Sequence, residues 1–562
     1  MFILDYLFQL LILFWILRSA KFILFYLYLW QLKNYHIGRF SDHFRTEKGK
    51  SLIYNRVNSI KVILLLYFFV LPYLPQYAAD FIYPLLSFQI AYLVLYYLLP
   101  ISLLLIYFLE GLKFMFDFVR GKVKFPALTK KVIFFLLLAF TLLIGTASAL
   151  LYLEKELSFL VLWLLIGDLF LPFFISVLVL FFQPITVILR WKIIWQAKRK
   201  RASMKDLLVI GITGSYGKTS TKEFLYAILS KKFNVLKTSE HQNSEIGISR
   251  CILDELRPEH EIFIVEMGAY SRGGIKLLCN IVKPRIGILT GISEQHLALF
   301  GSQRNIMRGK YELIESLGEN GLAFFNGDNE YCLELYNQTS TPKKIFVSGP
   351  GTLDFSPDIW AENVILQKDY IMFEACLNSE KEKIKAYLSG THFVLNLLAA
   401  IGVAKTLGMT LKEISEAIFK IDSPQNTMNI FEGIKGTIII DDTYSSNPEG
   451  VIAALNHLNI YGGKKMIIMP CLIELGKASR DVHYRIGEKI GETCEAFIVT
   501  TKDYFRAIGE GFLRKGGKEE NAIFTDNLKE ILEIIYNFWG PGDVILLEGR
   551  VPEGLLNSLV KK

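Results

Sequence analysis

Acidic residues are scarce in the first third of this 562-residue chain. Residues 1–205 hold 23 basic and only 9 acidic side chains, so this third has a net charge of +14 and the remainder has −6. Because the remainder has no positive surplus to neutralise phosphates, the charge balance excludes a nucleic-acid-binding protein. Cysteine is rare too. The six cysteines form no C-x-x-C pair, which excludes a disulfide scaffold and a zinc knuckle and fits a reducing compartment.

Long uncharged runs in the same third predict membrane-spanning helices, because a hydrocarbon core about 30 Å thick needs roughly 20 helical residues. Phe2–Trp30 is interrupted by Arg18 and Lys21; its length and the lack of a cleavage site argue against a signal peptide, and an interfacial helix is the alternative. We predict about five membrane helices within residues 1–190. The other four runs are Val62–Ala79, Phe81–Leu109, Val132–Leu153 and Leu169–Leu189.

Strongly basic loops alternate with loops that carry almost no basic residues. Lys33–Lys61, Lys113–Lys131 and Arg190–Lys205 carry seven, six and seven Lys or Arg residues. The positive-inside rule therefore predicts a multi-pass protein of the cytoplasmic membrane, with everything after Arg190 in the cytoplasm. Asp168 lies within an apolar stretch. Such a group either faces a partner or a cavity or, in the interpretation that we favour, caps a break between two helical pieces near the outer surface.

A glycine-rich loop follows the last predicted span. Leu207–Ile212 predicts a strand and Lys222–Ser230 a helix, and a loop between a strand and a helix is the context that a phosphate-binding loop requires. Backbone N–H groups and the helix N-terminus would hold a polyphosphate, with Lys218 on its terminal phosphates and Thr219 on Mg²⁺. The predicted nucleotide-binding residues are Thr213, Gly214, Ser215, Tyr216, Gly217, Lys218, Thr219 and Ser220.

Two later strands end in candidate site residues. The first, Glu261–Gly268, contains Glu266 near its end, and the second, Gly287–Ile292, is followed by His296. Because the carboxyl ends of parallel strands face the ligand in doubly wound sheets, we expect Glu266 to face the bound ligand, and His296, just past a strand end, is a candidate metal ligand. For His296, an ordinary structural histidine is the alternative.

An ordered set of motifs resembles the Mur ligase family over residues 206–562. The resemblance implies an α/β architecture with a P-loop-type central domain and a Rossmann-like C-terminal domain. It also implies an ATP-dependent, ADP-forming ligase that joins an amine to a carboxylate with ATP and Mg²⁺. The motifs are Thr213–Thr221, Asn243–Gly247, Glu266–Gly268, His296 with Phe300–Ser302, Arg308–Leu313, Gly390–Asn396, Asp441–Pro448 and Glu474–Gly476.

The resemblance also implies roles for single residues. Thr219, Glu266 and His296 would lie around magnesium, and Lys218, Lys310, His296 and Glu266 would be catalytic. Lys310 matches a lysine that family members commonly carbamylate; an ordinary helix-face lysine is the alternative. Asn396 would face the adenine, with a helix-face amide as the alternative, and Asp442 would face the ribose or the phosphates, with a turn as the alternative. Weaker substrate candidates are Asn243, Glu245, Tyr444, Asn447 and Arg550.

Several positions depart from the family pattern. Pro424–Asn429 replaces a glycine–arginine pair, and Pro470-Cys471 replaces a glycine–aspartate pair. Leu547-Glu548 precede Gly549-Arg550 where a lysine is usual. Arg550 would either contact the carboxylate of the incoming amino acid or lie on the surface. The family's soluble UDP-sugar-binding domain has no counterpart before the phosphate-loop strand, which begins soon after the last predicted span.

The resulting prediction has four parts: a membrane domain (1–190), a basic juxtamembrane linker (191–205), an ATP-binding central domain (206–425) and a C-terminal domain (426–562), with a hinge near Ile421–Asn429. The predicted function is amide-bond formation on a cell-envelope precursor. That precursor is either lipid-linked, with Arg190, Lys192 and Lys198–Arg201 beside its pyrophosphate headgroup, or soluble and UDP-linked. The basic run Lys198–Arg201 has two interpretations, contact with anionic lipid and charge that sets the membrane topology. The alternatives are a poly-γ-glutamate-type ligase, a transport-coupled membrane ATPase and a non-catalytic scaffold.

Overall fold

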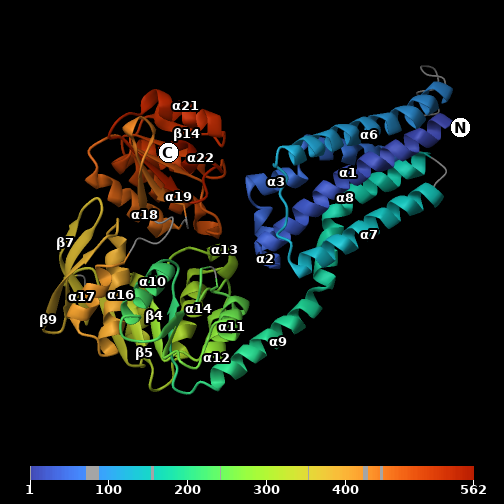
Figure 1. Cartoon of the computed structure of the whole chain (residues 1–562). Coiled ribbons are helices and arrows are strands. Elements are labelled where there is room, and N and C mark those ends of the chain that lie inside the picture. The colour runs from blue at the N-terminus through green and yellow to red at the C-terminus, as the bar shows by residue number, and fades with distance from the viewer. Residues whose placement is uncertain are drawn as a thin grey trace. The chain divides into compact units, whose positions relative to one another are not determined.

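The computed structural model describes residues 2–33, 35–70, 88–153, 157–240, 242–351, 353–421, 428–443 and 447–561. Its internal contacts divide the chain into two compact units, Met1–Ile188 and Leu189–Lys562. Figure 1 shows the ribbon of both units, coloured from blue at the N-terminus to red at the C-terminus. The predicted hinge near Ile421–Asn429 lies largely outside the described residues, because 422–427 are not among them.

The first unit consists of helices, and α1 packs against α6, α7 and α8. Within the described residues, three helical segments are long and apolar enough to cross a membrane: Phe8–Leu32, Lys130–Tyr152 and Phe159–Ala202. They coincide with three of the five predicted spans; Val62–Ala79 and Phe81–Leu109 lie partly outside the described residues. The helices are α1 (Phe2–Leu32), α2 (Ile37–His43), α3 (Glu47–Ile53), α4 (Arg56–Val70), α6 (Phe88–Val119), α7 (Lys130–Leu153) and α8 (Leu157–Phe181), followed by α9 (Gln183–Ala202).

Four charged side chains meet inside this helical unit. Arg18 of α1 pairs with Asp168 of α8 and, at 2.6 Å, with Glu110 of α6. Lys61 of α4 pairs with Glu110 and, at 2.9 Å, with Asp168. Our favoured interpretation of Asp168 as a helix cap is therefore wrong: α8 runs unbroken from Leu157 to Phe181, and two cations compensate the buried carboxylate.

The second unit contains a nine-stranded sheet with the order β2-β3-β1-β4-β5-β6-β7-β8-β9. Strands β2 to β7 are parallel, whereas β8 and β9 are antiparallel additions at one edge. The strands are β1 (Leu208–Thr213), β2 (Val235–Lys237), β3 (Ile262–Glu266), β4 (Ile286–Leu289), β5 (Leu322–Asn326), β6 (Lys343–Val347), β7 (Ile359–Leu366), β8 (Ile371–Leu377) and β9 (Glu380–Ala386).

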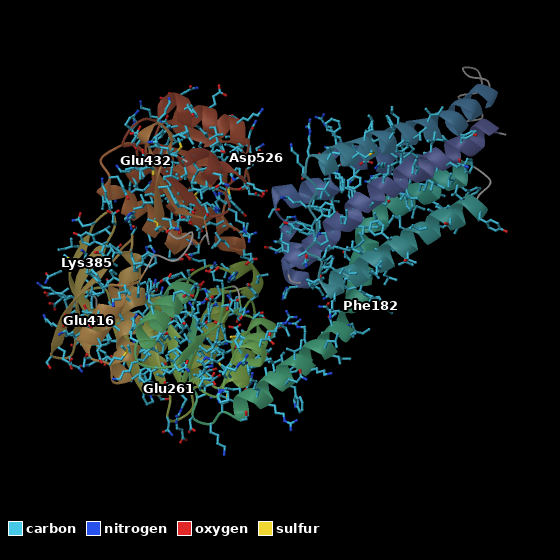
Figure 2. The ribbon with its side chains drawn as sticks, in the orientation of Figure 1. Phe182, Glu261, Lys385, Glu416, Glu432 and Asp526 are labelled. Atoms are coloured by element: carbon cyan, nitrogen blue, oxygen red, sulfur yellow. The ribbon has the colours of Figure 1, made fainter. Side chains whose placement is uncertain are left out.

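Helices cover both faces of this sheet, as expected for parallel strands that are apolar on both sides. Ile210 and Ile212 of β1 pack with α10, α16 and α17, whereas Val209 packs on the opposite face with α11, α12, α14 and α15. Figure 2 shows α17 beside β9, marked by Glu416 and Lys385. The helices are α10 (Lys218–Leu229), α11 (Glu245–Asp254), α12 (Gly274–Val282), α13 (Leu297–Phe300), α14 (Gln303–Glu315), α15 (Glu330–Gln338), α16 (His392–Thr406) and α17 (Leu411–Ile418).

The last part of the chain forms a six-stranded sheet with the order β10-β11-β15-β12-β13-β14, in which only β10 is antiparallel. This is the open, mostly parallel arrangement of a Rossmann-like fold. Its strands are β10 (Asn429–Glu432), β11 (Ile438–Asp442), β12 (Lys465–Met469), β13 (Ala496–Val499), β14 (Ala522–Phe524) and β15 (Val544–Glu548). Its helices are α18 (Pro448–His457), α19 (Ser479–Thr493), α20 (Phe505–Arg514), α21 (Leu528–Phe538) and α22 (Leu555–Leu559).

Most residues of the predicted basic linker are helical and built into the second unit. Ile194 and Ala197 of α9 are buried in the core on the α11 and α12 face of the sheet. The Arg201 guanidinium donates hydrogen bonds to three carbonyl oxygens, those of Val282, Met204 and Leu207. The connection to the nucleotide-binding strand is therefore a packed helix up to Ala202.

Candidate active site

The phosphate loop connects β1 to α10 and rests on the segment that follows β4. The Ser215 N–H donates to the Gly291 carbonyl at 2.7 Å, and the Ser215 hydroxyl accepts from the Ser293 N–H at 3.1 Å. At the end of β1, the Thr213 hydroxyl donates to the Met267 carbonyl at 2.9 Å. Neighbouring parallel strands therefore hold the loop at the carboxyl edge of the sheet, as the sequence predicts.

Two glycines allow the loop its path. Gly217 has φ = 75° and is the N-cap of α10, a left-handed conformation that disfavours side chains. A Cβ at Gly214 would lie 2.1 Å from the Thr290 hydroxyl oxygen, so a side chain there would displace the loop from the neighbouring strand. The N-terminus of α10 then offers N–H groups and a positive dipole end to an anion.

The Tyr216 side chain packs against the segment after β4 that holds the phosphate loop. A Cβ at Gly291 would lie 2.2 Å from the Tyr216 ring, and the Asn329 amide donates to the Tyr216 hydroxyl at 3.3 Å. Burial raises the pKa of Tyr216, so its hydroxyl stays protonated. The side chain predicted to belong to the nucleotide site thus packs within the domain, whereas its backbone belongs to the loop.

Lys218 and Thr219 begin α10 and lie beside the end of β3. The Lys218 ammonium donates to the carbonyls of Gly214 at 2.8 Å and Ser215 at 3.2 Å, which curls the loop around it. The Thr219 hydroxyl donates to Glu266 at 2.9 Å. Burial lowers the pKa of Lys218, and the Glu266 carboxylate opposes this shift.

Glu266 has two further polar neighbours. The Asn243 amide donates to it at 3.0 Å, and the Lys222 ammonium lies 3.7 Å away. Burial alone would raise the pKa of Glu266, but Lys218, Asn243 and Lys222 outweigh it, so the pKa is lowered and the side chain is anionic at neutral pH. Asn243, a weak substrate candidate from the sequence, therefore contacts a predicted metal ligand.

Magnesium favours hard oxygen ligands and uses one or two carboxylates together with phosphate oxygens. The adjacent Thr219 hydroxyl and Glu266 carboxylate at the helix N-terminus fit that requirement. Within the described residues, no three His, Cys, Asp or Glu side chains gather into a metal-binding group, so the fit rests on these two oxygens and the phosphates of a nucleotide.

His296 follows β4 and contacts Glu474, which follows β12 of the six-stranded sheet. Its Nδ1 lies 2.5 Å from a carboxylate oxygen of Glu474, and Tyr270 packs edge-on against its ring at 5.1 Å. Burial lowers the pKa of His296, with Glu474 opposing and Lys310 and Lys218 adding to the shift. The remaining ring nitrogen, Nε2, is the atom left for a metal.

Lys310 lies on α14 with 2% of its surface exposed. Burial, reinforced by the positive charge of Lys218, lowers its pKa to about 7, and Glu266 opposes this shift. The charges of Lys218 and Glu266 act on the pKa of Lys310, and those of Lys310 and Lys218 act on the pKa of His296. A buried lysine with this pKa is largely unprotonated slightly above neutrality.

Asn396 and Asp442 belong to different sheets of the unit. Asn396 of α16 accepts a hydrogen bond from Thr221 of α10 at 3.3 Å, so it borders the phosphate-loop helix. Asp442 ends β11 opposite Glu548 of β15, and burial raises its pKa to about 7 while a hydrogen bond with Glu548 opposes the shift. Glu548, which stands where the family usually has a lysine, therefore forms a pair of buried carboxyl groups with Asp442.

The weaker substrate candidates separate. Glu245, the first residue of α11, pairs with Arg190 of α9. Asn447 caps α18, its side-chain oxygen accepting from the Gly450 N–H at 2.9 Å. Arg550 is exposed after β15, and Tyr444 lies outside the described residues.

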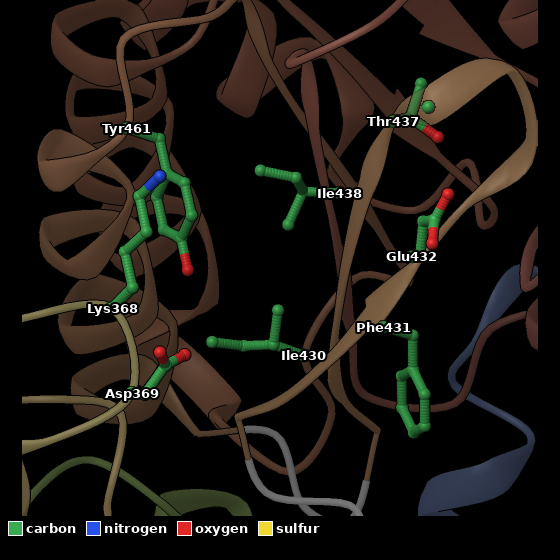
Figure 3. A pocket seen from close by; sticks show the side chains of 9 residues that line it. Lys368, Asp369, Ile430, Phe431, Glu432, Thr437, Ile438 and Tyr461 are labelled. Carbon is green, nitrogen blue, oxygen red and sulfur yellow. The ribbon is translucent and has the colours of Figure 1, made fainter.

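The sequence reasoning assigned no role to Lys222. Its side chain is fully buried and pairs with Glu223 at 3.2 Å as well as lying near Glu266. Its only sequence signal is a lysine directly after the phosphate-loop residues. Nothing in the sequence indicated a pocket of about 380 Å³ between the β7–β8 turn and strands β10 and β11. In this pocket the Lys368 ammonium lies 5.5 Å from the Tyr461 ring (Figure 3). Among the described residues, none of the predicted site residues lines it.

Comparison with known families finds two adjacent matches. Residues 212–404 match the Mur ligase middle domain, and residues 428–551 match the Mur ligase glutamate ligase domain. The curated relatives include the UDP-N-acetylmuramoyl-tripeptide–D-alanyl-D-alanine ligase of Synechocystis, 32% identical over 50% of this chain and 59% of that protein. The Bacillus subtilis ligase of the same name is 28% identical over 63% of this chain and 76% of its own length.

Solved structures give the same fold. MurF from Acinetobacter baumannii superposes with a TM-score of 0.58 at 26% identity, covering 64% of this chain and 77% of that one. MurF from Thermotoga maritima, solved with ADP, gives a TM-score of 0.57 at 26% identity over 66% and 83%. The chain spans 59% of the length of the Synechocystis relative, so the shared part is the two α/β domains.

Proposed function

The chain belongs to the Mur ligase family through its middle and C-terminal domains, and from this premise we propose that it is an ATP-dependent, ADP-forming ligase joining an amine to a carboxylate on a cell-envelope precursor. The observation that carries the proposal is the β1–α10 loop, in which Lys218 and Thr219 stand at a helix N-terminus beside the anionic Glu266. ATP and Mg²⁺ are its cofactors.

In the proposed reaction, a carboxylate oxygen of one substrate attacks the γ-phosphorus of ATP, and the bond to the bridging oxygen of ADP breaks. The amine of the second substrate then attacks the acyl carbon; the carbon–oxygen bond to phosphate breaks and the amine loses a proton. Little covalent chemistry falls to the protein, so positioning and charge stabilisation dominate. Lys218 and the N-terminus of α10 stabilise the negative charge of the transferring group.

Thr219, Glu266 and His296 would hold Mg²⁺, which supplies charge neutralisation on the phosphates. Asn243 and Lys222 act on Glu266, holding its carboxylate in the anionic form that a cation needs. His296 also contacts Glu474 of the C-terminal domain, so this contact joins the two α/β domains. We propose that the two domains close around the substrates.

Lys310 is proposed to be carbamylated. Its amine nitrogen would bond to the carbon of CO₂ and release a proton, which replaces a positive charge with a negative one. The buried position and the pKa of about 7 support this, because only the unprotonated amine can react. The resulting anion would stand among Lys218, His296 and Glu266 and favour a nearby cation.

The acceptor class follows from the relatives, whose names give UDP-N-acetylmuramoyl-tripeptide and D-alanyl-D-alanine as substrates. We propose a muropeptide-like carboxylate acceptor and an amino acid or dipeptide amine donor. The apolar helices before residue 190 support a protein of the cytoplasmic membrane with a lipid-linked acceptor, and a soluble UDP-linked acceptor is the runner-up. A poly-γ-glutamate-type ligase is the nearest alternative.

The experiment measures phosphate release by the full chain in detergent against a panel of amino acids and dipeptides, each with soluble or lipid-linked acceptors. Release that requires both a carboxylate and an amine supports the ligase. Lys218→Ala should abolish it, whereas Lys231→Ala, an exposed lysine just after α10, should not. ADP formation that is independent of any carboxylate–amine pair would refute the proposal and favour a transport-coupled ATPase.

A further inference from the structure

The helix α9 carries six basic residues and no acidic residue, and its two faces differ in what surrounds them. With about 100° between successive residues, Arg190, Ile194, Ala197 and Arg201 lie along one face. That face is occupied by protein: Ile194 and Ala197 are buried in the core, Arg201 bonds three carbonyls and Arg190 pairs with Glu245.

The opposite face of α9 exposes two large aromatic side chains. Trp191 and Trp195, one turn apart, are 55% and 58% exposed. Arg199 follows one turn later, with its guanidinium 5.4 Å from the Trp195 ring, and the exposed Lys192 lies beside them. These four residues, together with the half-buried Lys198 that lies one turn after Trp195, are called the outer face of α9 below.

Tryptophan and basic side chains on one helix face are the combination that membrane interfaces select. The indole ring has an apolar body and one polar N–H, which suits the headgroup level of a bilayer, and Lys or Arg attracts anionic headgroups. The position along the chain agrees, because Arg190 to Lys192 directly follow the uncharged run Leu169–Leu189. A run of this length is enough to cross the hydrocarbon core.

We propose that the outer face of α9 binds the headgroup layer of an anionic phospholipid bilayer. The protein contacts of the other face attach α9 from Arg190 to Arg201 to the middle domain, so this lipid contact would hold the nucleotide-binding domain itself against the membrane surface. The basic residues of α9 therefore have two different roles, protein contact and lipid contact. Arg201 and Lys200, whose ammonium donates to the Leu253 carbonyl, are structural, whereas Lys192, Lys198 and Arg199 are left to the lipid. The inference does not depend on the ligase proposal.

The test places the full chain in vesicles of phosphatidylcholine, with or without phosphatidylglycerol, that contain lipids brominated near the headgroup or near the bilayer centre. The emission of Trp191 and Trp195 is the difference between the parent chain and the Trp191→Phe/Trp195→Phe variant. We expect bromine near the headgroup to quench this difference emission more strongly than bromine at the centre. Trp360→Phe, on β7, is the matched control and should remove no quenched emission.

Charge is tested separately with Lys192→Gln/Lys198→Gln/Arg199→Gln. Each basic residue at an anionic surface is worth about fivefold in binding, so the triple variant should lose about a hundredfold of the preference for phosphatidylglycerol. The charge-matched control replaces three exposed lysines elsewhere, Lys420, Lys518 and Lys529, and should keep the preference.

Three results would overturn the proposal. Difference emission quenched by aqueous acrylamide but by neither brominated lipid would show that the outer face is in water. Emission shielded from all quenchers would show that protein covers it, either another part of this chain or a second copy. Stronger quenching by central bromine would place the two indoles in the hydrocarbon core.

Discussion

The buried ion pairs of Asp168 permit a stability prediction with a worked magnitude. Asp168 and Arg18 are each 2% exposed, Lys61 is fully buried, and each cation contacts both Asp168 and Glu110. Asp168→Asn leaves two cations with one carboxylate, so one buried positive charge loses its compensation. Breaking a buried pair in this way costs about 3–5 kcal/mol of unfolding free energy. This corresponds to roughly a 150- to 5,000-fold rise in the population of molecules in which the helices around Asp168 are locally unfolded.

Amide hydrogen exchange of α1 and α8 peptides, in the full chain in a mild detergent, measures this loss locally. The matched control is Asp117→Asn, whose partner Lys21 lies 2.9 Å away with side chains 28% and 30% exposed. That pair should contribute at most about 1 kcal/mol. Adding Lys61→Gln to Asp168→Asn restores neutrality and should recover most of the protection. Equal exchange in the Asp168 and Asp117 variants would refute the reasoning.

Four further predictions concern the active site. Lys218→Ala should remove nucleotide binding in calorimetry while circular dichroism stays unchanged, and unaltered affinity would show that the loop is not the phosphate site. His296→Ala and Glu266→Ala should each lower kcat by orders of magnitude through lost charge stabilisation; parent-like kcat in either would remove it from the site. Lys310→Ala should be inactive and partly rescued by short carboxylates, and full activity without rescue would make Lys310 an ordinary buried lysine. The free amine of Lys310 permits a further prediction in CO₂-free buffer. Its pKa falls from 10.5 to about 7 on folding, so burial of this amine costs most below pH 7 and less as pH rises towards 10. Lys310→Met should therefore gain more stability at low pH than at high pH in thermal melts, and a constant gain would contradict the shift.

The phosphate loop is the part of the site that the sequence predicts best, since all its determinants are contiguous. A strand and glycines at 214 and 217 stand within a few residues of a helix, although this helix begins at Lys218 and not at the predicted Lys222. The ends of β3 and β4 are predictable for the same reason, because a parallel sheet brings the carboxyl ends of neighbouring strands together.

Long-range pairings escaped the sequence reasoning. Asp168 and Arg18 are 150 residues apart, and no local pattern tells which cation meets a carboxylate inside an apolar run. The same holds for His296 and Glu474, whose segments come from different sheets. Lys222 was missed because a polar residue on a short amphipathic helix is usually solvated, whereas here it lies buried beside Glu266.

The central claim, that this chain activates a carboxylate with ATP, is tested most directly by the fate of one oxygen atom. A peptide acceptor whose carboxylate carries a heavy oxygen isotope is incubated with the full chain, ATP, Mg²⁺ and an amine donor, and the released phosphate is analysed by mass spectrometry. Attack by the carboxylate on the γ-phosphorus followed by loss of phosphate from the acyl carbon predicts that one labelled oxygen appears in each phosphate released. Phosphate that carries only an oxygen from water, while the acceptor keeps both labelled atoms, would contradict the account.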